Sequence, residues 1–89
     1  MTFTKDPDAV LDYSVDWSLW LAGDQIASSE WLLEGGALIE KVTDSHTSTK
    51  ATVWLRGGEA GTTYLVTNRI VTVAGRTDDR SISVRVEDR

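Results

Sequence analysis

Apolar and polar residues alternate with a period of two along most of this sequence, and this feature most constrains its fold. From Leu11 to Leu21 every odd position is apolar or aromatic, while Asp, Ser, Asp and Ser fill the even positions up to Trp20. The same period returns at 51–56, 64–73 and 81–86, in segments rich in Val, Ile, Thr, Tyr and Trp. Such residues fit a pleated, half-buried surface, so the pattern predicts β-strands.

Glycine and polar clusters punctuate these segments at intervals typical of a β-sandwich. The turn signals are Gly23-Asp24, Gly35-Gly36, Gly57-Gly58, Gly61, Ala74-Gly75 and the polar stretch 44–50. The predicted strands are 9–17, 25–33, 37–43, 49–56, 62–73 and 79–87, with a hairpin around Gly75. The first strand has an alternative, in which Ser18 to Ala22 form a short turn. The fold class predicted is all-β, an antiparallel sandwich of about seven strands.

Composition and charge narrow the choice of function. The 89 residues suit a single domain, 1–89. Fourteen acidic against nine basic residues give a net charge of −5, which argues against nucleic acid as a partner. The sequence has no cysteine, which rules out disulfides and thiolate metal sites. No signal-like start and no apolar run of membrane-spanning length occur, so no membrane association is expected.

The chemistry-bearing residues do not assemble into a catalytic or metal-binding pattern. His46 is the only histidine and lies beside Asp44 and Ser45, but a catalytic triad draws its members from distant segments. The four acidic residues Asp6, Asp8, Asp12 and Asp16 lack the spacing of a calcium loop. We therefore expect no enzyme, no metal and no cofactor. A small hydrolase with clustered carboxylates is the least favoured hypothesis.

Four tryptophans in so short a chain are its most informative residues. Trp17 follows the core parity and Trp31 precedes two leucines, so both are expected to be core anchors. Trp20 and Trp54 have the opposite parity to their apolar neighbours. Either a bulge or strand end turns them back inside, or they are exposed anchors for a neighbouring subunit. We favour the second interpretation.

The segment 1–9 precedes the alternating pattern and is expected to be an extended N-terminal arm. Pro7 cannot donate to a central ladder, and Phe3 is a second candidate contact residue in the arm. The arm is predicted to add a strand to a neighbour or to dock in its groove. A frayed terminus is the alternative.

The segment 50–86, KATVWLRGGEAGTTYLVTNRIVTVAGRTDDRSISVRV, resembles the last three strands of immunoglobulin-like and fibronectin type III domains. In those domains a tyrosine at the start of the penultimate strand hydrogen-bonds back to the chain before it. Tyr64 is the matching position. Because the cysteine pair of antibody domains is missing, the fibronectin-like variety is nearer.

A wider resemblance rests on KDPDAVLDYSVDW, WLAGDQI, VWLRGGEAGTTY, NRI and AGRTDDRS. Together these motifs are similar to small virion proteins of tailed bacteriophages, of the fiber–tail adaptor type. The resemblance implies a structural adaptor in the virion, assembled in the host cytoplasm, that contacts other phage proteins and copies of itself. It supplies no catalytic residue. The alternative function is a carbohydrate-binding module with a tryptophan platform.

Overall fold

The computed structural model of the protein describes residues 2–36 and 38–88. Residues 1, 37 and 89 lie outside the described residues. They are, in turn, the first residue of the predicted arm, the first residue of the third predicted strand and the last residue of the predicted domain. The elements in chain order are β1 (Thr2–Lys5), β2 (Leu11–Asp16), α1 (Ser18–Leu21), β3 (Ile26–Glu34), β4 (Ile39–His46), β5 (Lys50–Gly57), β6 (Thr63–Thr72) and β7 (Thr77–Val86).

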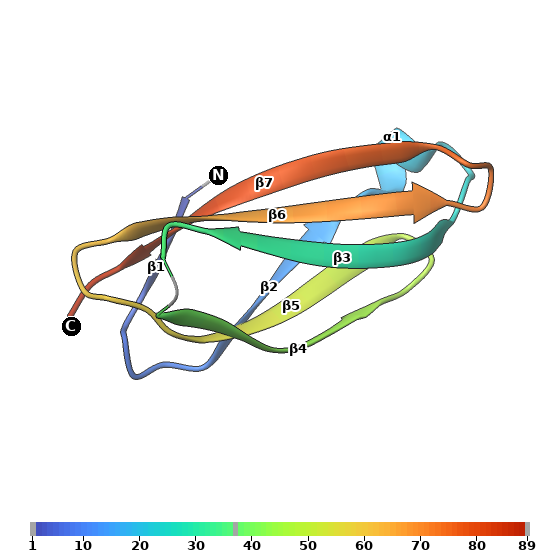
Figure 1. Ribbon diagram of the computed structural model, residues 1–89. Coiled ribbons are helices and arrows are strands. Elements are labelled where there is room, and N and C mark those ends of the chain that lie inside the picture. Colours follow the sequence, from blue (N-terminus) through green and yellow to red (C-terminus); the bar gives the residue numbers. More distant parts are fainter. Residues whose placement is uncertain (1, 37, 89) are drawn as a thin grey trace.

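The strands form two sheets that pack face to face (Figure 1). One sheet has the order β1-β7-β6-β3 and the other the order β2-β5-β4. The predicted all-β sandwich is therefore confirmed. One pairing departs from the antiparallel prediction, since β1 runs parallel to β7. The molecule is elongated, with extents of 42 × 19 × 19 Å.

Each of the six predicted strands overlaps an observed one, and the hairpin around Gly75 joins β6 to β7. The connection predicted at 44–50 is shorter than expected, because β4 extends to His46 and β5 begins at Lys50. The Thr47 hydroxyl accepts hydrogen bonds from the N–H groups of Thr49 and Lys50. This local capping lets three residues make the turn, and the polar residues before it belong to an edge strand.

The core lies between the sheets and contains both predicted tryptophan anchors, Trp17 and Trp31. Trp17 is fully buried, and its indole Nε1–H donates to Oδ1 of Asn68 over 2.9 Å. The amide of Asn68 in turn donates to Ser29 Oγ and to the carbonyl of Glu30. Asn68 is itself fully buried, so this network satisfies polar groups that would otherwise be costly to bury.

Tyr64, at the start of β6, makes the hydrogen bond expected of it. Its hydroxyl oxygen accepts the backbone N–H of Glu59, five residues earlier, over 2.8 Å. The turn before it requires glycine at position 58, where φ is +100° and a Cβ atom would lie 2.6 Å from Cγ2 of Val86. The glycine allows the chain to pass close to the end of β7 and to hold Tyr64 inside.

The N-terminal arm is not free to pair with a neighbour in this structure, which corrects that expectation. Residues 2–5 form β1 and pair with residues 83–86 of the chain's own β7. Phe3 packs against the core with its ring 5.0 Å from that of Tyr13. Lys5 is fully buried, and its ammonium donates to the carbonyls of Asp6 and Gly57. These contacts hold the segment in its own sheet, which no frayed terminus would allow.

The period of two ends at Asp16, and a single helical turn, α1, begins at Ser18, which confirms the alternative of a short turn over Ser18 to Ala22. Trp17, Trp20 and Leu21 then lie three and four residues apart on one side of the turn, and the Leu21 N–H donates to the Trp17 carbonyl. Leu19, assigned to the core by parity, instead points into solvent and is 95% exposed. Over the described residues, no helix is long and apolar enough to cross a membrane.

Candidate contact surfaces

The residues considered for catalysis do not come together around His46. This histidine ends β4 and is exposed, while the carboxylate of Asp44 pairs with Lys41 over 2.9 Å. Ser45 neighbours His46 along the strand, so the two side chains leave opposite faces of the sheet. Within residues 2–36 and 38–88, no three His, Asp or Glu side chains gather in a way that could hold a metal ion.

Trp20 is half-buried at one end of the molecule. Its ring meets that of Trp17 edge-on, with centroids 5.3 Å apart. The guanidinium of Arg76, from the β6–β7 turn, lies 4.3 Å from the centroid of the Trp20 ring. The strand end therefore turns Trp20 partly inward, as in the alternative that parity left open. Its indole joins α1 to the β6–β7 hairpin.

Asp24 fixes the same junction. Its carboxylate accepts the backbone N–H groups of Gln25 and Ala74, and also two N–H groups of Arg76. Arg76 donates further to the carbonyl of Leu21. The hydrogen bond from Thr72, with those from Gln25, Ala74 and Arg76, lowers the pKa of Asp24 to about 2 despite partial burial. The two segments at this end of the molecule are thus held rigidly together.

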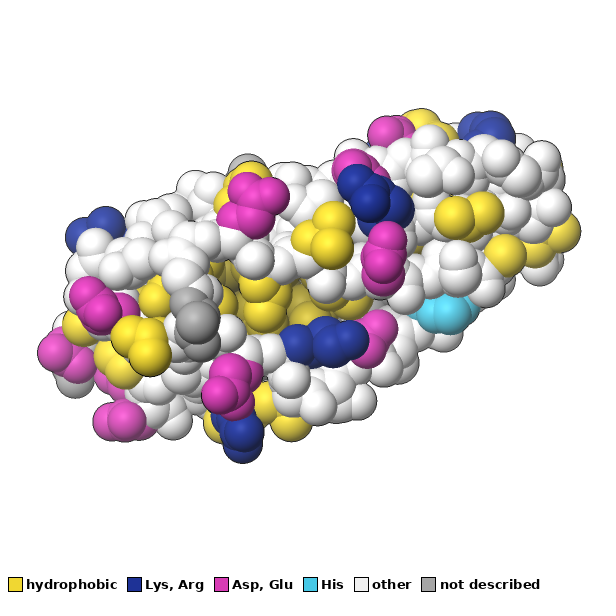
Figure 2. Space-filling model, in the orientation of Figure 1, with side chains coloured by type: hydrophobic (Ala, Val, Ile, Leu, Met, Phe, Trp, Pro, Cys, Tyr) yellow, Lys and Arg dark blue, Asp and Glu magenta, His cyan; other side chains and the backbone are white. Residues whose placement is uncertain are grey.

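Two apolar side chains are exposed on this rigid end. Leu19 on α1 is almost wholly exposed, and Val73 after β6 is 69% exposed. We call Leu19, Trp20 and Val73 the tip. Figure 2 shows hydrophobic side chains at the right-hand end of the molecule, where Figure 1 places α1 and the β6–β7 turn. Exposed apolar groups on an ordered backbone are suited to contact with another protein.

Trp54 lies on the outer face of the three-stranded sheet. It belongs to the central strand, β5, whose residues 51, 53 and 55 are fully buried, and its own side chain is 40% exposed. Asp12 on β2 and Thr43 on β4 pair with it across the sheet. The strand continues without turning the indole inside, so Trp54 presents one broad apolar surface among polar neighbours. We call this surface the Trp54 face.

Phe3 and Pro7, the other two candidate contact residues, are both partly buried. Phe3 packs on Tyr13, and Pro7 lies in the turn after β1. Both contribute to the chain's own fold. Burial lowers the pKa of the neighbouring Lys5 ammonium, while the carboxylates of Asp6 and Asp8 act in the opposite direction.

The sequence did not show that Leu19, Asp24 and Arg76 come together at one end of the molecule. The available signal was Ala22-Gly23-Asp24, a turn motif that follows Trp20, the tryptophan whose parity differs from that of its apolar neighbours. Ala22 and Gly23 both take positive φ, at 49° and 96°. Such a pair ends a helical turn more often than it ends a strand. Position 76, fifty-two residues after Asp24, carries no local signal of the contact.

The fold and its surfaces define a small all-β sandwich that presents exposed apolar side chains on ordered elements. Residues 5–85 match the protein family described as podophage GP4 fiber-tail adaptor protein gp77. The chain belongs to this family, which is a structural kind of protein and whose name places it in the tail of a bacteriophage particle. A search of curated proteins gives no match to the chain.

Proposed function

We propose that this protein is a non-enzymatic adaptor that joins a fiber to another component of a tailed-phage particle through protein–protein contacts. Membership of the fiber–tail adaptor family supports the role. The observation that carries it further is the presence of two separate apolar surfaces, the tip and the Trp54 face. An adaptor must contact at least two partners, and these surfaces lie on different parts of the molecule.

The tip is suited to be one of the two contacts. Leu19 and Val73 expose apolar area that a partner would remove from water, at about 25 cal/mol per Å². The Asp24–Arg76 contacts hold α1 and the hairpin in place, so little ordering entropy is lost on binding. Trp20, half-buried on the same helical turn as Leu19, adds part of its indole to this surface.

The Trp54 face is suited to be the second contact. Tryptophan is enriched among the residues that dominate binding energy at interfaces. The Arg56–Glu40 ion pair lies on the neighbouring rung of the sheet and would form part of a polar rim around the indole. The partner at this face is another virion protein or a second copy of the chain, arranged in a closed symmetric assembly.

Three further properties belong to the proposal. The protein acts in the virion and is assembled in the host cytoplasm. It uses no cofactor. Its excess of acidic residues makes a contact with nucleic acid unfavourable.

Two exposed-site variants test which surface serves which partner. Leu19→Ser and Trp54→Ser are each mixed with the fiber and tail proteins encoded beside this chain, and complexes are followed by size exclusion with light scattering. Leu19→Ser is expected to abolish one complex and Trp54→Ser the other. Leu65→Ser, at an exposed leucine near the start of β6 in the four-stranded sheet, is the matched control. If both variants retain both complexes, the assignment of these surfaces is wrong.

The alternative function, a carbohydrate-binding module, is favoured by one observation only, the exposed indole of Trp54. Trp20 does not serve as a platform, because Trp17 and Arg76 already occupy its ring. A glycan array discriminates the two functions. Binding of a sugar that Trp54→Ser removes, together with failure to bind any virion protein, would replace the adaptor proposal.

A further inference from the structure

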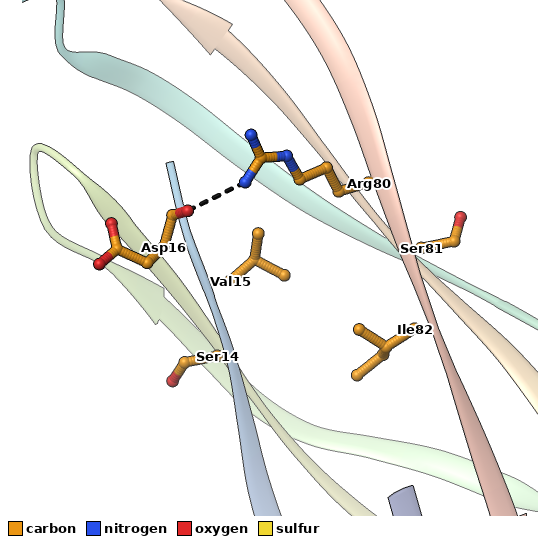
Figure 3. Close-up of a pocket in the computed structure, with 6 residues that line it drawn as sticks. All are labelled: Ser14, Val15, Asp16, Arg80, Ser81 and Ile82. Carbon is orange, nitrogen blue, oxygen red and sulfur yellow. Dashed lines mark hydrogen bonds between the residues drawn. The ribbon is translucent and has the colours of Figure 1, made fainter. Parts of the chain in front are cut away.

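The two sheets leave an open seam between β2 and β7. A cavity of about 320 Å³ lies there, lined by Ser14, Val15, Asp16, Arg80, Ser81 and Ile82. Figure 3 shows the side chains of Val15 and Ile82 across from each other in this cavity. At one end of the cavity Arg80 reaches across, donating to the Asp16 carbonyl over 3.0 Å and lying 4.4 Å from the Trp17 ring centroid.

The β2 side of the seam is an unpaired strand edge in the described part of the chain. β2 pairs with β5 on one side only. The Trp17 N–H donates to Thr49 on the β5 side, and main-chain groups alternate along an antiparallel strand. The N–H and C=O groups of Asp12, Ser14 and Asp16 therefore face the seam. The Asp16 carbonyl already accepts a hydrogen bond from Arg80. The N–H and C=O groups of Ser14 are therefore the ones at the cavity that a partner strand would bond.

The β7 side of the seam is covered in part. β1 covers only residues 83–86 of β7. The Val86 N–H donates to the Thr62 carbonyl, and the Thr72 N–H donates to the Arg76 carbonyl. The main-chain N–H and C=O groups of even-numbered residues in β7 therefore point towards β6, and those of odd-numbered residues point towards the seam. The Asp78 carboxylate already accepts the Asp79 N–H. This bond occupies only the Asp79 N–H, and the main chain of Ser81 also faces the seam. β2 is taken as the edge that accepts a strand because two carboxylates, those of Asp12 and Asp16, flank its open position at Ser14.

We propose that an extended segment of a partner protein adds to the free edge of β2, with an apolar side chain in the cavity between Val15 and Ile82. This inference rests on the proposed adaptor function and names the chemistry of one partner. Strand addition satisfies the main-chain groups of Ser14 directly, and the cavity selects the inward side chain.

Charge decides what the outward side chains of the segment must be. Asp12 and Asp16 lie on the outer face of β2, on either side of Ser14, about 13 Å apart at about 3.3 Å per residue. Hydrogen bonds from Ser18 lower the pKa of Asp16, and the charges of Lys50, its partner across the sheet, and Arg80 act in the same direction, so this carboxylate stays charged. Residues opposite both carboxylates would be basic. A five-residue segment opposite residues 12–16 thus has lysine or arginine at its first and last positions, with an apolar residue next to one of them.

A synthetic peptide with the core Lys-Val-Thr-Val-Lys tests the proposal directly. This pattern reads the same in both directions, so it suits parallel and antiparallel addition alike. The peptide is added to ¹⁵N-labelled protein, and binding is followed by NMR. The expected result is slower amide exchange at Ser14 and Asp12, with shifted signals at Val15 and Ile82. A peptide with glutamate in place of both lysines is expected not to bind.

Charge variants of the protein provide the matched comparison. Asp12→Asn with Asp16→Asn keeps the fold and the Ser18 contact, and is expected to weaken the Lys peptide about fivefold or more at low salt. Glu30→Gln with Glu34→Gln removes the same charge from β3, also an edge strand, and is expected to leave the affinity unchanged. Ser14→Pro removes the N–H at the open edge and is expected to abolish binding.

Several results would overturn the inference: equal binding of the Glu peptide, signals that shift on β3 or β4 instead of β2, or no binding at all. None of these depends on a virion protein being present. If the peptide fails while the fiber complex forms, the seam proposal falls and the adaptor function stands. If the peptide binds while no virion protein does, the adaptor function falls.

Discussion

Trp17 and Trp54 are chemically identical residues whose positions give them opposite roles. The first is fully buried between the sheets and hydrogen-bonded to Asn68, and the second lies on an outer face. Only burial and local contacts separate a residue that holds the fold together from one available to a partner.

Alanine substitutions measure this difference. Trp17→Ala is expected to lower the free energy of unfolding by about 3–5 kcal/mol, because it leaves a cavity in the core. Trp54→Ala is expected to cost about 1 kcal/mol, the value of lost cross-strand contacts. Urea unfolding followed by circular dichroism measures both. Equal costs would show that Trp54 is part of the core.

Removing the buried amide of Asn68 is expected to lower the free energy of unfolding by more than the loss of one hydrogen bond would. Asn68→Ala leaves the Trp17 indole N–H without its partner inside the core, at a cost of about 2 kcal/mol in unfolding free energy. Ser29→Ala removes only one acceptor of the same network and is expected to cost about half as much. The same urea titration compares them, and a smaller effect for Asn68→Ala would contradict this role.

At the scale of the element, α1 and β1 are the two segments that alternation alone did not predict. A period of two identifies strands with buried and exposed faces, and it placed the six longer strands correctly. It left open whether a turn interrupts the pattern over Ser18 to Ala22, and the structure has a helical turn there. Nor can it identify β1, whose four residues include a buried lysine at a core position.

Contacts between residues far apart in the chain also could not be predicted from the sequence. Asp24 with Arg76, and Trp17 with Arg80, are more than fifty residues apart and are brought together by the strand order. Tyr64 could be predicted because its hydrogen bond is local. The tryptophans could be ranked by parity, although Trp20 could not be placed until the turn at Ser18 was known.

The link between α1 and the hairpin is expected to depend on pH. The pKa of Asp24 is lowered to about 2 in the folded protein, against about 3.9 in an unfolded chain. Its contribution to stability is therefore fully present above about pH 4 and is lost as the pH falls towards about 2. The difference in melting temperature between the wild type and Asp24→Asn should shrink across this window. A constant difference would contradict the assigned role.

Docking of β1 is expected to depend on Lys5. Lys5→Met keeps the length of the side chain but loses its bonds to the carbonyls of Asp6 and Gly57, at a cost of about 2 kcal/mol. Faster amide exchange along residues 2–5 should accompany it. Lys41→Met, at an exposed ion pair, is the control and should change stability by less than about 0.5 kcal/mol. Similar effects of the two variants would show that β1 docks without this lysine.

At the scale of the whole molecule, the elongated sandwich separates its contact surfaces. The tip lies at one end of a body 42 Å long, the Trp54 face lies on one sheet, and the seam runs between the sheets. This separation lets several neighbours contact the chain together, as an adaptor requires. The family match and the geometry are therefore consistent with the same role.

The most direct test of that role is the mass of the complex formed when the wild-type protein is mixed with the fiber protein and its tail partner, by light scattering after size exclusion. We expect one species that contains all three proteins, and one smaller two-protein species whenever one of the partners is omitted. A chain that elutes alone as a monomer in every mixture would contradict it.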